Sequence, residues 1–219
     1  KNQKISKLAG IMTHAGHSYS SNNKNNLISI ANQEREELLK AKKFLKNVGQ
    51  FCSIVSLGST PTILNATNLS NITEARCGVY MLWDLAQASK NICKIENIAI
   101  SVLASVIHHN VQEQRIIIDA GALALSKDFS ANKFMPTVKY GLVCNVNTGE
   151  PIPRMCVNEL HQEHGTINVT DKRWFELLPI GSLVRVLPNH ACLTCAAHEQ
   201  YHVLDKNLIT ETWKRTNGW

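Results

Sequence analysis

The sequence predicts a chain of two parts, an α/β part followed by a mostly β part. In the first third, short apolar runs alternate with a helical pattern, and segments rich in Gly and hydroxyl side chains follow the apolar runs. After about residue 92, short runs rich in Ile and Val are separated by turn residues instead. We therefore place the boundary near Lys90 and Asn91, which gives domains at residues 1–91 and 92–219.

The first part reads as strand, helix, strand, strand. A helix is expected over residues 26–48, because apolar residues recur there at helical spacing and Gly49 follows as a C-cap. Pro61 suits the first turn of a second helix. Three buried strands are expected at residues 8–13, 51–57 and 71–76. This order, with polar residues at the strand ends, is typical of an α/β barrel, whose sites lie at the carboxyl ends of the strands.

The second part is predicted to be mostly β. Its expected strands lie at residues 98–107, 115–119, 137–146, 165–169, 183–187 and 200–204. Of the 219 residues, 44% are hydrophobic, which is enough for a sizeable core. We find no internal repeat.

Composition and charge exclude several functions. The net charge of +6 is scattered, so no nucleic-acid partner is expected. No run of about 18 apolar residues exists, so we expect no membrane partner. The cysteines are odd in number, 7, and lack the spacing of a small disulfide scaffold, which favours reduced thiols and a cytoplasmic location.

The tripeptide His190-Ala191-Cys192 follows a Pro-Asn turn. An imidazole and a thiolate one residue apart can bind the same metal ion, and two protein ligands leave positions open for water or substrate. The alternative is packing, because Cys often behaves as a small hydrophobe. Cys192 and Cys195 also form a Cys-x-x-Cys, but no thioredoxin-like βαβ pattern surrounds it, so we do not interpret it as a redox motif.

Residues 58–62, Gly-Ser-Thr-Pro-Thr, follow an expected strand and open a helix. Backbone N–H groups at such a turn, with the hydroxyls of Ser59 and Thr60, suit a phosphate; an ordinary capped turn is the alternative. Arg76 and Gly78 follow the next strand, where Gly78 would let the backbone approach a ligand, although Arg76 alone reads as a surface charge.

Two further segments carry histidines. Residues 13–19, Thr-His-Ala-Gly-His-Ser-Tyr, place imidazoles and a phenol at a strand end, where they could contact a flat cofactor. Glu163 and His164 lie in a polar loop that could bring an acid and an imidazole to a site, or could be a solvated turn. His108 and His109 point to opposite faces of a strand, so we interpret them as structural.

Six motifs in this order resemble the eukaryotic-type D-serine dehydratase and D-threonine aldolase family, which consists of pyridoxal-phosphate enzymes with the alanine racemase fold. The resemblance spans essentially the whole chain. The motifs are residues 13–19 (THAGHSY), 58–62 (GSTPT), 73–80 (TEARCGVY), 119–121 (DAG), 163–165 (EHG) and 188–192 (PNHAC).

The resemblance implies roles for individual residues. His190 and Cys192 would bind Zn²⁺, and His14 would lie near the pyridine ring as the catalytic residue of this chain. Val79 stands where the family usually has Asn, so it could act only through its backbone. The implied cofactor-binding residues are Tyr19, Ser59, Thr60, Arg76, Gly78, Val79 and Tyr80.

The implied reaction is the zinc-assisted β-elimination of a D-hydroxyamino acid, D-serine giving pyruvate and ammonia. Retro-aldol cleavage, as in the D-threonine aldolase branch, is the alternative within the family. That branch usually has Asp as its second metal ligand and uses a harder ion, so Cys192 favours the dehydratase branch.

One family feature has no counterpart here. The lysine that forms the Schiff base lies near the start of these proteins, on the first barrel strand, and no lysine of this chain has a matching context. We therefore expect the C-terminal part of a TIM-like (β/α) barrel followed by the β domain, completed by an N-terminal segment of the same protein. A homodimer is implied by the resemblance, and a non-catalytic remnant that binds phosphate or metal remains a third interpretation.

Overall fold

The computed structural model describes residues 7–216, and its internal contacts divide the chain into two compact units at Met81 and Leu82. This division lies before the boundary expected near Lys90. Residues 82–91 group with the β unit because Leu85 is fully buried in a cluster with Cys144 and Leu187.

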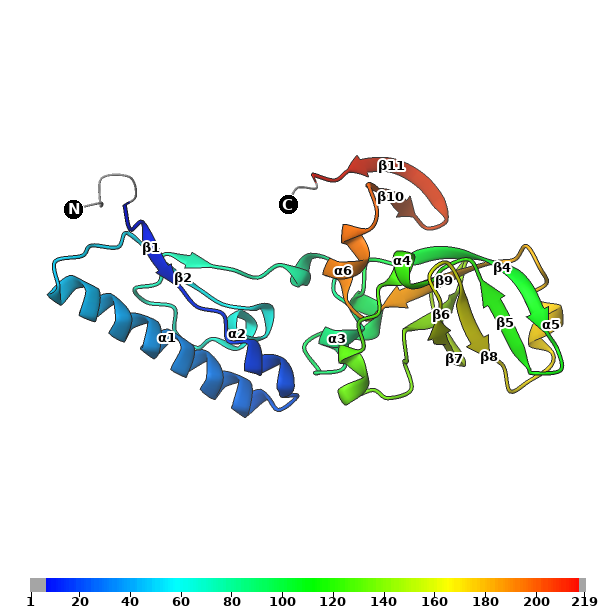
Figure 1. Cartoon of the computed structure of the whole chain (residues 1–219), viewed down its shortest axis with the longest axis horizontal. Coiled ribbons are helices and arrows are strands. Elements are labelled where there is room, and N and C mark those ends of the chain that lie inside the picture. The colour runs from blue at the N-terminus through cyan, green and yellow to red at the C-terminus, as the bar shows by residue number, and fades with distance from the viewer. Residues whose placement is uncertain (1–6, 217–219) are drawn as a thin grey trace. The chain divides into compact units, whose positions relative to one another are not determined.

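The first unit contains a parallel sheet of order β1-β2-β3, formed by Gly10–Met12, Ile54–Leu57 and Glu74–Ala75 (Figure 1). Helix α1, Lys24–Asn47, packs on it through Leu38, which contacts Val55 and Leu57. The short helix α2, Thr60–Asn65, follows β2 directly. The expected order of strand, helix, strand, strand is confirmed, and Asn23 caps α1 by accepting a hydrogen bond from the backbone N–H of Asn26 (3.1 Å).

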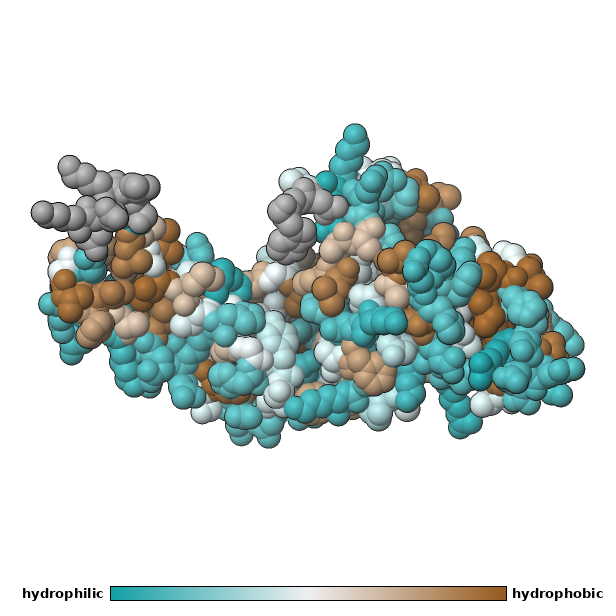
Figure 2. All heavy atoms as spheres, in the orientation of Figure 1, coloured by the Kyte–Doolittle hydropathy of each residue, from teal (hydrophilic) through white to brown (hydrophobic). Residues whose placement is uncertain are grey.

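Both outer strands of this sheet have an unpaired edge within the described residues, because β1 and β3 each pair only with β2. Apolar side chains are exposed nearby at Met12, Phe51 and Ile54, and Figure 2 shows apolar surface over β1 and β2. Parallel strands with open edges need partners or cover. Part of an α/β barrel would present these features, and the barrel itself stays a prediction.

The second unit is mostly β, as expected. Its core is a closed six-stranded barrel of order β4-β5-β8-β7-β6-β9. Inward-facing residues alternate along the strands and fill the interior, as Val102, Ala104 and Val106 do in β4. The strands are β4 Val102–Asn110, β5 Arg115–Ile118, β6 Gly141–Asn145, β7 Pro151–Leu160, β8 Gly165–Asn168 and β9 Leu183–Pro188.

The second unit also contains short helices. They are α3 Leu85–Ala88, α4 Ala122–Leu125, α5 Trp174–Leu177 and α6 Ala191–Ala196, with 3₁₀ turns at Ile95–Asn97 and Ser130–Lys133. After α6, strands β10 Gln200–Asp205 and β11 Leu208–Lys214 form a separate antiparallel hairpin (Figure 1). No helix within residues 7–216 is both long and apolar enough to span a membrane.

Strands β7 and β11 were not anticipated. Prolines usually argue against an inner strand, and β7 contains two of them. Pro151 begins the strand and Pro153 is exposed, and the register of β7 against β6 shifts. Arg154 also adopts a positive φ of 61°, so the backbone departs locally from a regular strand.

Candidate metal and cofactor sites

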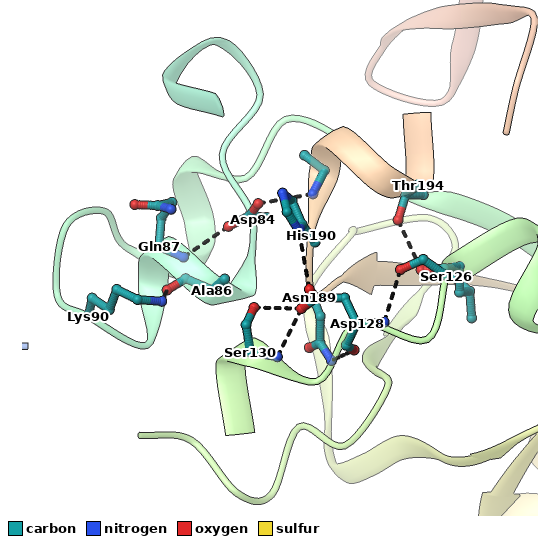
Figure 3. A network of polar contacts seen from close by, with 12 residues as sticks. Asp84, Ala86, Gln87, Lys90, Ser126, Asp128, Ser130, Asn189, His190 and Thr194 are labelled. Carbon is teal, nitrogen blue, oxygen red and sulfur yellow. Dashed lines mark hydrogen bonds and ion pairs between the residues drawn. The ribbon is translucent and has the colours of Figure 1, made fainter. Parts of the chain in front are cut away.

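The His-x-Cys motif lies where strand β9 turns into helix α6. His190 occupies the N-cap position in an extended conformation (φ −138°, ψ 102°), and its side chain makes no capping hydrogen bond. The imidazole instead faces Asp128, with Nδ1 3.2 Å from Oδ2 (Figure 3). Cys192 follows in the first turn of α6, and its side chain is exposed.

Asp128 is fixed from several directions. The backbone N–H and hydroxyl of Ser130 donate to its Oδ1 at 2.9 and 2.5 Å. The buried amide of Asn189 donates to the carbonyl of Asp128 at 2.8 Å and to that of Lys139 at 2.6 Å. Since Asn189 immediately precedes His190, its hydrogen bonds fix the position of Asp128 relative to the imidazole.

This pairing sets the charge of both groups. Burial raises the pKa of Asp128, but hydrogen bonds from His190 and Ser130 outweigh it and lower the pKa to about 2. The hydrogen bond to Asp128, followed by one to Cys192, raises the pKa of His190 to about 10. The chain without a metal therefore holds an imidazolium against a carboxylate, and a metal ion would replace the proton on the imidazole.

These residues fit a zinc ion. With Nδ1 directed at Asp128, Nε2 is the ring nitrogen available to a metal, which is the carboxylate–histidine arrangement of many zinc sites. Cys192, two residues further on, also contributes a hydrogen bond that raises the pKa of His190. Within residues 7–216 no group of three or more His, Cys, Asp or Glu could hold a metal ion. A His–Cys pair has fewer ligands than the four of a closed zinc site.

The candidate cofactor residues lie in the first unit, where three segments follow the carboxyl ends of β1, β2 and β3. After β2, Ser59 caps α2, and its hydroxyl also contacts Thr62 and Ser18. Thr60 is buried beside it. The Ser59 hydroxyl is therefore engaged in the capping box and is not the expected contact to a phosphate.

The backbone has free donors at this edge. Among the described residues, the N–H groups of Thr60, Gly78 and Val79 have no hydrogen-bond acceptor. A Cβ placed on Gly78 would meet no atom within 4 Å, so the space beside this glycine is open. Unpaired N–H groups next to open space suit an anion such as a phosphate.

The other predicted residues of this unit are distributed around the same sheet end. The rings of His14 and Tyr19 stack with centroids 5.9 Å apart, and His14 Nδ1 lies 3.3 Å from the carbonyl of Gly58. The Arg76 guanidinium donates to the hydroxyl of Ser56 and the carbonyl of Thr13, so it ties strand ends together. Tyr80 is 45% exposed.

Glu163 and His164 are not brought to the metal motif by any contact within the described residues. They form the turn between β7 and β8, which packs against the start of α4. His109 Nε2 donates to the carbonyl of Leu178 at 2.8 Å and the ring lies edge-on to Phe175, as a structural histidine would.

Sequence reasoning missed the carboxylates that support the candidate sites. Asp128 contacts His190 across 62 residues of sequence. In the first unit, Glu34 of α1 accepts from the Thr13 hydroxyl (3.1 Å) and the Ala15 N–H (2.9 Å), on either side of His14. The only local signal is that Asp128 heads an Asp-x-Ser turn, which marks a turn and not a site.

Comparison with known proteins finds relatives over most of the chain. Residues 99–204 match the family model described as "putative serine dehydratase domain". The chain is 36% identical to D-threo-3-hydroxyaspartate dehydratase from Delftia sp. over 217 residues, which is 97% of this chain and 57% of that protein. It is 30% identical to D-serine dehydratase from Dictyostelium discoideum over 220 residues, 96% of this chain and 54% of that protein.

The chain is a relative of the D-serine dehydratases. It spans little more than half the length of these relatives. Two structures of a D-threo-3-hydroxyaspartate dehydratase carry alanine in place of a cysteine and of a histidine two residues before it, and the cysteine mutant is described as the metal-free form. The structure of the cysteine mutant superimposes with a TM-score of 0.89 at 36% identity and covers 97% of this chain and 57% of that one.

The fold comparison extends to the alanine racemase-like proteins. An alanine racemase-like protein from Idiomarina loihiensis superimposes with a TM-score of 0.89 at 39% identity, covering 96% of this chain and 56% of that one. D-threonine aldolase from Filomicrobium marinum gives a TM-score of 0.70 at 17% identity over 94% of this chain and 52% of that one, a likeness of fold alone.

Proposed function

We propose that this chain supplies the metal pair and the phosphate-binding segments of a pyridoxal-phosphate-dependent lyase that removes water from a D-3-hydroxyamino acid. D-serine and D-threo-3-hydroxyaspartate are the proposed substrates. The observation that carries the proposal is the Asp128–His190 pair, which orients the imidazole two residues before the exposed Cys192. The same His-x-Cys spacing occurs in the mutated residues of the D-threo-3-hydroxyaspartate dehydratase structures.

In this proposal His190 Nε2 and Cys192 Sγ hold the zinc ion. When bound, zinc supplies a Lewis acid for a substrate hydroxyl that is to leave as water. Asp128 keeps the imidazole oriented and compensates the positive charge of the ion. The exposed side of Cys192 leaves the remaining coordination positions accessible.

The backbone N–H groups of Thr60, Gly78 and Val79 would bind the cofactor phosphate, since they have no acceptor within residues 7–216 and the space beside Gly78 is open. Pyridoxal phosphate, when bound, supplies an electron sink for the substrate α-carbon. His14 and Tyr19 would contact the cofactor as a stacked pair, and Glu34 would fix the backbone on either side of His14. Ser59, Arg76 and Tyr80 remain proposed contributors, with Ser59 and Arg76 acting by holding the strand ends.

The net reaction balances without a redox partner. The substrate loses its α-proton and its β-hydroxyl as water, and the released amino-acrylate takes up water to give a 2-oxo acid and ammonia. D-serine therefore gives pyruvate and ammonia.

We further propose that a complementary N-terminal segment of the same protein completes the catalytic unit and carries the Schiff-base lysine. The open edges of β1 and β3 and the exposed Met12, Phe51 and Ile54 support this, because parallel strands need neighbours. A homodimer is part of the proposal by family resemblance only.

The test is a substrate panel given to the protein that carries this chain, with pyridoxal phosphate and zinc. A 2-oxo acid and ammonia from D-serine or D-threo-3-hydroxyaspartate, lost in His190→Ala and Cys192→Ala, is the expected result. Glycine and acetaldehyde from D-threonine would indicate the aldolase reaction instead. Failure to retain pyridoxal phosphate after borohydride reduction, with no turnover of any substrate, would favour the non-catalytic interpretation.

A further inference from the structure

One buried carboxylate joins the two short helices around the metal motif. Asp84 is 1% exposed and is the N-cap of α3, where its Oδ1 accepts from the backbone N–H of Gln87 at 2.9 Å. Its Oδ2 accepts from the backbone N–H of Ala191, also at 2.9 Å (Figure 3). The same side chain therefore caps α3 and α6, which begin 106 residues apart in the sequence: Leu85 and Ala191.

The second of these bonds is made to the peptide between the proposed metal ligands. Ala191 separates His190 from Cys192 and is the first residue of α6. A helix start needs acceptors for its free N–H groups, and the N-cap side chain usually supplies one. His190 supplies none, because its imidazole faces Asp128, and Asp84 takes over that role.

A backbone bond fixes the two segments at a second point. The N–H of Ala86 donates to the carbonyl of Asn189 at 3.0 Å, one residue before His190. With Asp84 on one side of His190 and this bond on the other, the turn that carries the imidazole is held by α3 from both directions. The bond from Asp84 is the only one of the two that a side-chain substitution can remove.

We propose that Asp84 is a positioning residue for the metal pair, fixing the Ala191 peptide so that His190 and Cys192 bind the same ion. This inference rests on the proposed metal site. Asp84 does not bind the ion itself in this scheme. Loss of its bond to Ala191 lets the first turn of α6 reorient, which separates the two ligands and weakens chelation.

The variant Asp84→Asn can keep only one of the two bonds. Its amide oxygen can still accept one N–H, but its NH₂ group is a donor and leaves the other N–H without an acceptor. We expect the 219-residue chain with this change to bind Zn²⁺ about 10 to 100 times more weakly in competition with a chromophoric chelator, the usual effect of losing an outer-shell partner. With Co²⁺ as a probe, the thiolate-to-metal absorption should also weaken.

Ala191→Pro tests the same bond from the donor side. Proline is favoured at the first position of a helix, and the extended conformation of His190 is compatible with a following proline. If both variants act through one hydrogen bond, the double variant Asp84→Asn/Ala191→Pro should bind Zn²⁺ no more weakly than the worse single variant. If the two substitutions acted through general destabilisation, their separate losses of Zn²⁺ affinity would add in the double variant.

Thr194→Val is the matched control. The Thr194 hydroxyl, buried in the same helix, donates to the carbonyl of Leu125 at 3.0 Å and touches neither ligand. This variant should unfold more easily yet bind Zn²⁺ like the wild type. Equal loss of affinity in Thr194→Val and Asp84→Asn would overturn the proposal, as would affinity within twofold of wild type for both Asp84→Asn and Ala191→Pro. If His190→Ala binds Zn²⁺ as tightly as the wild type, the proposed metal site itself is wrong and the role of Asp84 is overturned with it.

Discussion

Gly121 should be intolerant of any side chain, because the backbone of the β7–β8 turn lies against its α-carbon. A Cβ at this position would lie 2.4 Å from the backbone nitrogen of His164 and 2.5 Å from the carbonyl oxygen of Gln162. The turn also accepts two hydrogen bonds from the start of α4, Ala122 N–H to His161 at 2.8 Å and Leu123 N–H to Gln162 at 3.1 Å. Gly121→Ala must therefore push the turn away from the helix.

The cost follows from these contacts. Forcing a methyl group into a packed site costs about 1–3 kcal/mol, and each weakened hydrogen bond adds about 1 kcal/mol. The lower entropy of the unfolded alanine chain offsets about 0.4–1 kcal/mol. We expect Gly121→Ala to lower the free energy of unfolding of the second unit by about 2–4 kcal/mol. All four tryptophans lie in residues 82–219, so urea denaturation followed by tryptophan fluorescence reports this unit.

Gly78→Ala is the matched control, since a Cβ there meets no atom within 4 Å and the φ of Gly78 lies outside the left-handed region. It should leave the first unit unchanged or stabilise it by up to about 1 kcal/mol, measured by the helical circular dichroism to which α1 contributes. The reasoning would be refuted if Gly121→Ala had the same free energy of unfolding as the wild type. It would also be refuted if Gly78→Ala lowered the free energy of unfolding as much as Gly121→Ala does.

Three further predictions concern the two candidate sites and the core of the second unit. Gly78→Ala should weaken binding of pyridoxal phosphate although it leaves the fold intact, measured by equilibrium dialysis; unchanged binding would exclude the Gly78 backbone from the phosphate site. At pH 8 iodoacetamide should alkylate Cys192 rapidly and the buried Cys144 slowly, because burial raises the pKa of Cys144 to about 11, and added Zn²⁺ should protect Cys192, as peptide mass mapping would show. Leu85→Ala should lower the free energy of unfolding by about 2–5 kcal/mol, since Leu85 is fully buried.

Elements with a strong local pattern could be predicted from the sequence. Helix α1 and the β4, β5 and β9 strands follow from apolar periodicity, which is a property of neighbouring residues. Strand β7 could not be recognised, because its prolines are tolerated only through their exposed positions in the barrel. Strand β3 is shorter than expected, since only Glu74 and Ala75 pair with β2.

The candidate metal ligands could also be found from the sequence, because both lie in one tripeptide and its spacing is visible. Their supporting carboxylates could not. Asp128 and Asp84 reach the motif across 62 and 107 residues, so their roles exist only in the folded barrel. In the sequence, Asp84 is explained as the N-cap of a helix and Asp128 as the first residue of a turn. Neither pattern therefore indicates a second role near the metal motif.

The two candidate sites differ in what they require of the sequence, and this explains why one is easier to recognise. A divalent cation needs side-chain donors of fixed direction and a compensating negative charge, here His190, Cys192 and Asp128. A phosphate needs N–H groups, which every residue except proline supplies, so in the proposed site Val79 would serve through its backbone as well as the family's Asn. Side-chain truncation should therefore abolish metal binding, whereas phosphate binding should respond chiefly to added bulk at Gly78.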